Sequence, residues 1–140
     1  MTHMSVKGVT FVIIRPSDEI LMQLRDNNSK RFSNMWCFPG GTPEPGESFV
    51  ETAVREIKEE YNLEIGSEDC KEIIEYELPY EKVDPVSAKV FLCRIRDDQQ
   101  PILREGADMK WMKIDEIKKL KLGFFQEEII PVLEKVLKNN

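Results

Sequence analysis

Apolar and polar positions divide the chain into short apolar runs joined by polar connections that contain Gly and Pro. Runs rich in β-branched residues predict strands, and the first run is apolar almost throughout, which is typical of a strand buried on both faces. The predicted strands cover residues 6–14, 20–24, 36–38, 71–78, 88–96 and 109–113. Residues 15–19 predict a turn, and residues 26–34 predict a polar loop.

A helical period begins after Ser48, a residue suited to capping the start of a helix over residues 49–61. At about 100° per residue, one apolar stripe of this helix is predicted to face the core: Val50, Val54, Ile57 and Tyr61, with Ala53 at its margin. A short helix is predicted over residues 114–120 and a final helix over residues 124–138. Pro131 either kinks the final helix or marks a later start.

This order of elements predicts a mixed α/β sandwich. The length of 140 residues predicts one domain, over residues 6–140, after a short leader of residues 1–5. The net charge of −6 argues against binding to long nucleic acids, which relies on clustered Lys and Arg. No apolar run approaches the roughly 20 residues that a membrane span needs, so no membrane association is expected. The sequence leaves open whether the protein is a monomer or a homodimer.

The cysteines and the single histidine limit the possible chemistry. Cys37, Cys70 and Cys93 show no CxxC spacing, which favours reduced thiols in a cytoplasmic protein. His3, in the leader, is the only histidine of the chain. This excludes Ser-His-Asp and Cys-His catalysis and His-rich zinc sites. The remaining possibilities are carboxylates, Lys, Arg, Tyr or a metal ion held by oxygen.

Acidic residues are crowded on the helix over residues 49–61. Glu56, Glu59 and Glu60 follow one another around the helix, next to the apolar stripe. Like charges three or four residues apart repel, and the C-terminal end of a helix disfavours anions. Arg55, four residues before Glu59, is placed to pair with that carboxylate. A solvated acidic face would usually mix both signs, whereas no lysine relieves these three glutamates.

The loop before this helix adds a second feature. It carries Gly40, Gly41 and Gly46, which permit positive φ and a close approach of a ligand, and it ends near Glu47. Carboxylates beside such a loop are what hard divalent cations prefer, with Mg²⁺ or Mn²⁺ held by carboxylate, water and substrate phosphate. The pattern therefore predicts a site for Mg²⁺ or Mn²⁺, because a bound cation would turn the repulsion among these glutamates into coordination.

The segment over residues 41–63, GTPEPGESFVETAVREIKEEYNL, resembles the box of the Nudix family, G-x5-E-x7-R-E-U-x-E-E-x-G-U, where U is a bulky aliphatic residue. The matching positions are Gly41, Glu47, Arg55, Glu56, Ile57, Glu59, Glu60 and Leu63. Asn62 stands where the family has Gly. That position is expected to end the helix in a left-handed conformation, for which Asn is the next best residue. The segments MWCFPGG and WMKIDEI also resemble the surroundings of the box.

The resemblance implies a fold, an activity and site residues. The fold would be an α/β/α sandwich with a mixed β-sheet between helices. The activity would be metal-dependent hydrolysis of a phosphoanhydride bond in a nucleoside diphosphate linked to a group X. Glu56, Glu59 and Glu60 would be catalytic metal ligands with Gly41, Arg55 would orient them, and Glu47 would support the metal site or the loop. Glu56 or Glu60 would accept the proton of the attacking water. Glu105 resembles the extra acid of the MutT-like members and is a further candidate ligand or base.

The substrate contacts lie outside the box. Lys30 and Arg31 are candidates to contact a terminal phosphate, Gly40 permits close approach, and Phe32, Trp36 and Phe124 are candidates to stack on a base. Tyr76 and Tyr80 are further stacking candidates. The short chain resembles members that hydrolyse (modified) nucleoside triphosphates to a nucleoside monophosphate and pyrophosphate.

Three alternatives stay open beside the triphosphate substrate. The first is a nucleotide-binding sensor without turnover, although the complete set of acids favours an enzyme. The second is a nucleotide-sugar or ADP-ribose pyrophosphatase. The third is an isomerase of a prenyl diphosphate on the same fold, which needs a catalytic cysteine.

Overall fold

One mixed β-sheet forms the centre of the molecule. The computed structural model describes residues 5–77 and 86–138, so His3, Leu78 and Tyr80 lie outside the described residues. Seven strands are found in this part of the chain: β1 (Ser5–Ile14), β2 (Ile20–Leu24), β3 (Trp36–Cys37), β4 (Gly40–Gly41), β5 (Cys70–Glu77), β6 (Val86–Arg94) and β7 (Asp108–Met112). Their order is β3-β2-β1-β6-β5, with β4 paired to β1 and β7 to β2. Only the β1–β6 pair among them is parallel.

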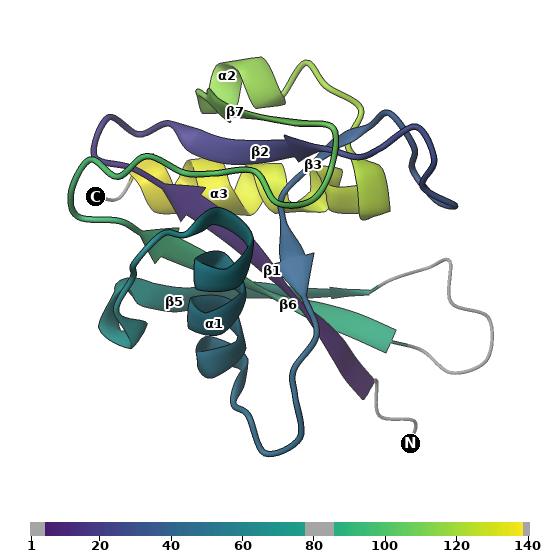
Figure 1. Ribbon diagram of the computed structural model, residues 1–140. Coiled ribbons are helices and arrows are strands. Elements are labelled where there is room, and N and C mark those ends of the chain that lie inside the picture. The colour runs from purple at the N-terminus through teal and green to yellow at the C-terminus, as the bar shows by residue number, and fades with distance from the viewer. Residues whose placement is uncertain (1–4, 78–85, 139–140) are drawn as a thin grey trace.

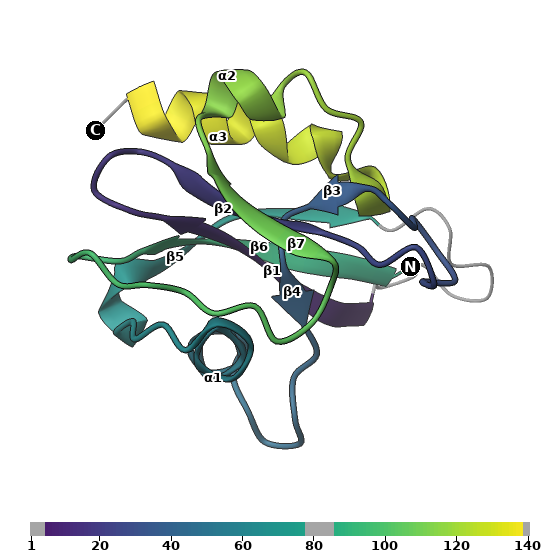
Figure 2. The same cartoon turned by 45° about the horizontal axis from the view of Figure 1, so that its top comes forward.

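Helices cover both faces of this sheet (Figures 1 and 2). Helix α1 (Phe49–Tyr61) lies on one face, and α2 (Ile114–Ile117) and α3 (Ile129–Lys138) lie on the other. Strand β1 contributes to both apolar clusters, with Phe11 and Ile13 on the α1 side and Val12 and Ile14 on the α3 side. The period of two explains why this strand is apolar throughout. The predicted α/β/α sandwich with a mixed sheet is therefore confirmed.

Both ends of α1 are fixed by their local sequence. The Ser48 side chain accepts from the backbone N–H of Glu51, and the Glu51 carboxylate accepts from the backbone N–H of Ser48, which completes a capping box. At the other end, Asn62 has φ 56° and ψ 35°, and its N–H donates to Lys58 O at 2.9 Å. The predicted cap and the predicted left-handed residue are both found.

The buried face of α1 differs from the predicted stripe. Ala53, Ile57 and Tyr61 are buried as expected, but Val50 and Val54 are only half-buried. Thr52 is fully buried instead. Its hydroxyl lies 2.7 Å from Glu47 Oε1 and 2.9 Å from Ser48 O, so the polar group is satisfied and can leave solvent.

The prediction that residues 40 and 41 lie in a loop was wrong. They form β4, in which Gly41 pairs with Val9 and Gly40 with Thr10. A Cβ atom at Gly40 would lie 2.6 Å from Val9 O, so only glycine permits this approach. Strand β4 thereby brings the start of the Nudix-like segment against the centre of the sheet.

The C-terminal helix starts later than residue 124. Helix α3 begins at Ile129, and Pro131 lies in its first turn, where the missing N–H leaves no helical bond unmade. Before it, the 3₁₀ segment η2 (Gly123–Glu128) contains Phe124 and Phe125, both with positive φ. A second 3₁₀ segment, η1 (Ser67–Asp69), precedes β5. Within the described residues, no helix has the length and apolar character that crossing a membrane would require.

The other predicted boundaries are off by a few residues. Strands β6 and β7 both begin and end earlier than predicted, β3 ends at Cys37, β5 begins at Cys70, and α2 ends at Ile117. Differences of one or two residues are usual at the ends of helices and strands.

Candidate active site

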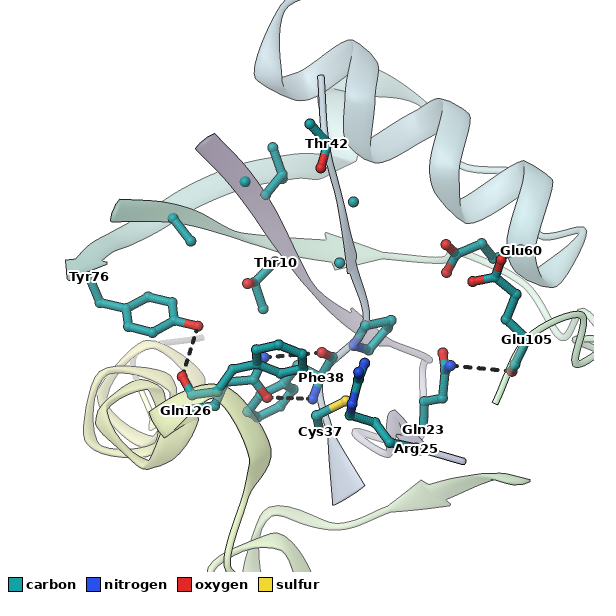
Figure 3. A pocket seen from close by; sticks show the side chains of 17 residues that line it. Thr10, Gln23, Arg25, Cys37, Phe38, Thr42, Glu60, Tyr76, Glu105 and Gln126 are labelled. Carbon is teal, nitrogen blue, oxygen red and sulfur yellow. Dashed lines mark hydrogen bonds between the residues drawn. The ribbon is translucent and has the colours of Figure 1, made fainter. Parts of the chain in front are cut away.

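A cavity of about 300 Å³ lies beside the central strand β1, near the end of α1. Its walls come from β1, β2, the β3–β4 segment, the last turn of α1, β5, β6, η2 and the loop before β7. Figure 3 shows that the two ends of the cavity differ in chemistry. The carboxylates of Glu60 and Glu105 lie at one end, and Tyr76 lies at the other. Phe124 also lines the cavity, and the Tyr76 hydroxyl donates to Phe124 O at 3.4 Å.

Arg55 connects the acids of α1 to the loop in front of it. Its Nε and Nη2 donate to the two oxygens of Glu47 at 2.7 and 2.8 Å. Its Nη1 lies 2.5 Å from Glu56 Oε1 and 3.1 Å from Glu59 Oε2, and Nη2 donates to Thr42 O at 3.1 Å. This guanidinium therefore sets the relative positions of three carboxylates and one main-chain carbonyl.

Glu47 is engaged by its own surroundings. Besides Arg55, its carboxylate accepts from the Thr52 hydroxyl and from the backbone N–H of Glu44 at 3.0 Å. The hydrogen bond from Arg55, followed by that from the Glu44 backbone, lowers the pKa of Glu47 to about 2. Glu47 thus joins the loop to Arg55 and Thr52 of α1 through hydrogen bonds.

Glu60 is the most perturbed carboxyl of the cavity. Burial raises the pKa of Glu60 from its ordinary 4.5 to about 8, and a hydrogen bond with Glu56 and the charges of Glu56, Glu105 and Glu59 add to this. Glu56 itself is packed against β4, because a Cβ at Gly41 would lie 2.6 Å from Glu56 Cγ. Such crowding of carboxylates is favourable when a cation lies among them.

The donors at this end fit a hard divalent cation. Glu60, Glu105 and Gly41 line the cavity, whereas Glu56 lies against Gly41 and Glu59 lies against Arg55, outside the cavity lining. Carboxylate and main-chain oxygens are the ligand type that Mg²⁺ and Mn²⁺ prefer. In the structure, the cation that contacts Glu56 and Glu59 is the guanidinium of Arg55. Over residues 5–77 and 86–138, no three His, Cys, Asp or Glu side chains form a preformed metal site.

The chain matches the family described as "NUDIX domain" over residues 4–133. The chain belongs to the Nudix family. It is accordingly a hydrolase that acts on diphosphate bonds. Nudix hydrolases generally use divalent metal ions, and carboxylates are the ligand type that such ions prefer.

Relatives of this Nudix hydrolase are named for different activities. The chain is 28% identical to "RNA pyrophosphohydrolase" of Pelagibacter ubique (strain HTCC1062) over 145 residues, which covers 92% of this chain and 89% of that one. It is 43% identical to "Nucleoside diphosphate-linked moiety X motif 6" of Mus musculus over 53 residues, 38% of this chain and only 16% of the mouse protein. The fold resembles the MutT protein from Methanosarcina mazei Go1, with a TM-score of 0.75, 19% identity and 99% of each chain covered.

The predicted substrate contacts are only partly gathered at the cavity of this Nudix hydrolase. Gly40 and Phe124 line it, whereas Lys30, Arg31, Phe32 and Trp36 do not. Phe32 packs behind Phe124, with ring centroids 4.7 Å apart. Trp36 is half-buried against the apolar cluster on the α3 side, since the short strand β3 turns its ring toward that core. Lys30 is exposed on the loop between β2 and β3.

Several cavity residues were not found by the sequence analysis. Arg25, directly after β2, lines the cavity, with its guanidinium 4.7 Å from the ring centroid of Phe124. Gln126 is buried and binds the main chain of Phe38 on both sides, accepting from its N–H at 2.7 Å and donating to its carbonyl at 3.1 Å. The position of Arg25, a cation directly after an apolar strand, was the one feature of the sequence that could have indicated a role for it at the cavity. Nothing in the local sequence marks Gln126.

The pKa of Glu60 predicts a pH-dependent stability for the metal-free protein. The folded state holds the Glu60 proton more tightly than the unfolded state does. The contribution of protonated Glu60 to the free energy of unfolding is therefore complete below pH 4.5 and is lost as the pH rises through about 8. Glu60→Gln removes this loss. We expect the metal-free variant to melt above the wild type at about pH 9 and close to it at about pH 5, as measured by calorimetry. An equal difference at both values would contradict the assignment.

Proposed function

We propose that this Nudix hydrolase cleaves a phosphoanhydride bond of a small nucleoside diphosphate linked to X, with a (modified) nucleoside triphosphate as its substrate. The products would be a nucleoside monophosphate and pyrophosphate, with Mg²⁺ or Mn²⁺ as cofactor. The observation that carries the proposal is the two-ended cavity, which offers carboxylates at one end and aromatic rings at the other. A polyphosphate bridged by metal suits the first end, and a planar base suits the second. The free thiols of Cys37, Cys70 and Cys93 suit a cytoplasmic location.

In this proposal the residues of the box would hold the metal ion and orient the attacking water. Glu56, Glu59 and Glu60 with the Gly41 carbonyl are the proposed metal ligands. A bound divalent ion offsets phosphate charge and lowers the pKa of water. A carboxylate then accepts one proton as the water oxygen bonds to phosphorus and the phosphoanhydride bond breaks. Glu56, Glu60 and Glu105 remain the candidate bases, and Glu105 reaches the cavity from outside the box.

Arg25 and Phe124 are the proposed contacts for the rest of the substrate. The Arg25 Nε donates to Arg31 O at 3.1 Å, which holds the side chain beside the Phe124 ring. Arg25 lies between the acidic end and the Tyr76 end of the cavity in Figure 3, so its guanidinium can bind a phosphate oxygen or stack on a base.

Arg25→Ala is therefore expected to raise KM for the substrate by about 10-fold or more, because a charge-assisted hydrogen bond or a stacking contact is lost. The turnover number should change much less, since Arg25 is not one of the proposed metal ligands or bases. Lys30→Ala is the matched control, because Lys30 is a cation on the same loop that does not line the cavity. Steady-state kinetics measures both, and equal effects of the two variants would remove Arg25 from the substrate site.

The function is tested with a panel of candidate substrates in Mg²⁺ or Mn²⁺. The panel contains ordinary and oxidised nucleoside triphosphates, ADP-ribose, nucleotide sugars, a prenyl diphosphate and a 5′-triphosphorylated oligoribonucleotide. The last is included because the Pelagibacter relative is named for an activity on RNA. Mass spectrometry of the products identifies the bond that is cleaved. Turnover of a free nucleoside triphosphate to monophosphate and pyrophosphate supports the proposal.

Two outcomes of this panel would overturn it. Preference for the oligoribonucleotide would select an RNA end-processing enzyme, despite the net charge of −6. Absence of turnover together with a nucleotide-induced rise in melting temperature would select a sensor.

A further inference from the structure

One glutamine side chain connects three segments at the acidic end of the cavity. Gln23, in β2, accepts a hydrogen bond at Oε1 from the hydroxyl of Tyr61, the last residue of α1. Its Nε2 donates to the main-chain carbonyl of Glu105 at 3.2 Å, as Figure 3 shows. Because a carbonyl can only accept, the amide nitrogen must face Glu105, and the amide oxygen is left for the Tyr61 hydroxyl.

The loop that carries Glu105 is shaped to meet this glutamine. Gly106 has φ +87°, and a Cβ at this position would lie 2.6 Å from Gln23 Nε2 and 2.9 Å from Leu24 O. Glycine therefore allows the loop to lie directly on β2. The next residue is also tied down, because the Ala107 N–H donates to Leu24 O at 2.9 Å.

Glu105 itself needs such support. Glu105 is exposed on a loop, and Gln23 binds its main-chain carbonyl rather than its carboxylate. Yet its carboxylate points toward that of Glu60 in the cavity (Figure 3). Tyr61 directly follows Glu60, so the hydrogen-bonded chain Tyr61–Gln23–Glu105 links the backbones of the two acids.

We propose that Gln23 is a positioning residue that fixes the Glu105 carboxylate beside Glu60 for hydrolysis. This inference rests on the proposed function, in which Glu105 acts as a ligand or base. A carboxylate displaced by about 1 Å loses much of its contribution to a reaction, so the effect of Gln23 should reach the chemistry only through Glu105.

A double-mutant cycle tests this dependence. Gln23→Leu removes both hydrogen bonds at similar volume, and Glu105→Gln removes the charge that is positioned. We expect Gln23→Leu to lower kcat by about 10-fold with little change in KM. The double variant should be no slower than Glu105→Gln alone, because the positioned group is already gone. Tyr61→Phe, which deletes one hydroxyl, should fall between the wild type and Gln23→Leu.

A second readout needs neither metal nor turnover. Hydrogen exchange of the metal-free protein should be faster at residues 105–107 in Gln23→Leu than in the wild type. Gln99→Leu is the matched control, since the Gln99 amide binds the Glu64 main chain on both sides, at 2.7 and 2.9 Å, apart from the cavity lining. It should speed exchange near Glu64 and leave kcat unchanged.

The outcomes separate this inference from the proposed function. Multiplicative effects in the cycle, unchanged exchange at residues 105–107, or full activity of Glu105→Gln would each overturn the role of Gln23. None of these results contradicts the proposed function. That function is tested by the substrate panel and by the turnover of Glu59→Gln, a variant that lacks one proposed metal ligand. If Glu59→Gln keeps full turnover, the proposed function fails, and the role assigned to Gln23 in hydrolysis fails with it.

Discussion

Glu59→Gln is expected to lower kcat by roughly 100-fold or more, because it removes a proposed metal ligand while keeping the shape of the side chain. Glu59 is more than half exposed and touches Arg55 at 3.1 Å, so little of the fold depends on it. The melting temperature of the metal-free variant should therefore stay close to that of the wild type. Binding of Mn²⁺, measured by calorimetry, should weaken together with turnover.

The control for this variant is Glu44→Gln. Glu44 is a similarly exposed glutamate, and its carboxylate lies 3.6 Å from the same Arg55 Nη1. Glu44 lies at a variable position of the box, so the loss of its charge should leave kcat and Mn²⁺ affinity nearly unchanged. Equal losses in the two variants would mean that overall negative charge, rather than ligation by Glu59, drives activity. A fully active Glu59→Gln would remove the basis of the proposed site.

The features that the sequence predicts well are those decided within a few residues. The Ser48 cap and the left-handed Asn62 are local, and the structure places both where the pattern indicates. The contact of Arg55 with Glu59 is also local, because the two residues are one helical turn apart. The nearly continuous apolar run of β1 likewise predicts a strand with two buried faces.

The features that the sequence misses depend on pairings between distant segments. Gln23 reaches Glu105 only because β2 pairs with β7, in the register that sets Gln23 opposite Met109. Gln126 reaches Phe38 across 88 positions of the chain. The positive φ of Phe124 has no local signal either, since an aromatic residue disfavours that conformation. Local patterns thus predict the acidic helix, and tertiary packing completes the cavity around it.

Arg55 is expected to be the position where a single change affects the site most widely. Arg55→Ala removes the guanidinium that contacts Glu47, Glu56, Glu59 and the Thr42 carbonyl. We expect kcat/KM to fall by about 100-fold, because the acids lose their common orienting partner. Arg55→Lys should recover little of this activity, since an ammonium cannot reproduce the bidentate contact with Glu47.

The same change should lower stability in a pH-dependent way. The pKa of Glu47 is held at about 2 chiefly by Arg55, so this carboxylate stabilises the fold above its ordinary pKa of 4.5 and ceases to do so as the pH falls through about 2. The difference in melting temperature between the wild type and Arg55→Ala should thus be largest near pH 7 and shrink toward pH 3.

Arg96→Ala is the control, because Arg96 makes a comparable two-oxygen contact with Asp69, at 2.8 and 3.0 Å, on an exposed surface. Arg96→Ala should keep full activity and lose little stability, since an exposed ion pair contributes little. If Arg55→Ala behaved in the same way, the guanidinium would be a surface charge and the acids of α1 would be positioned without it.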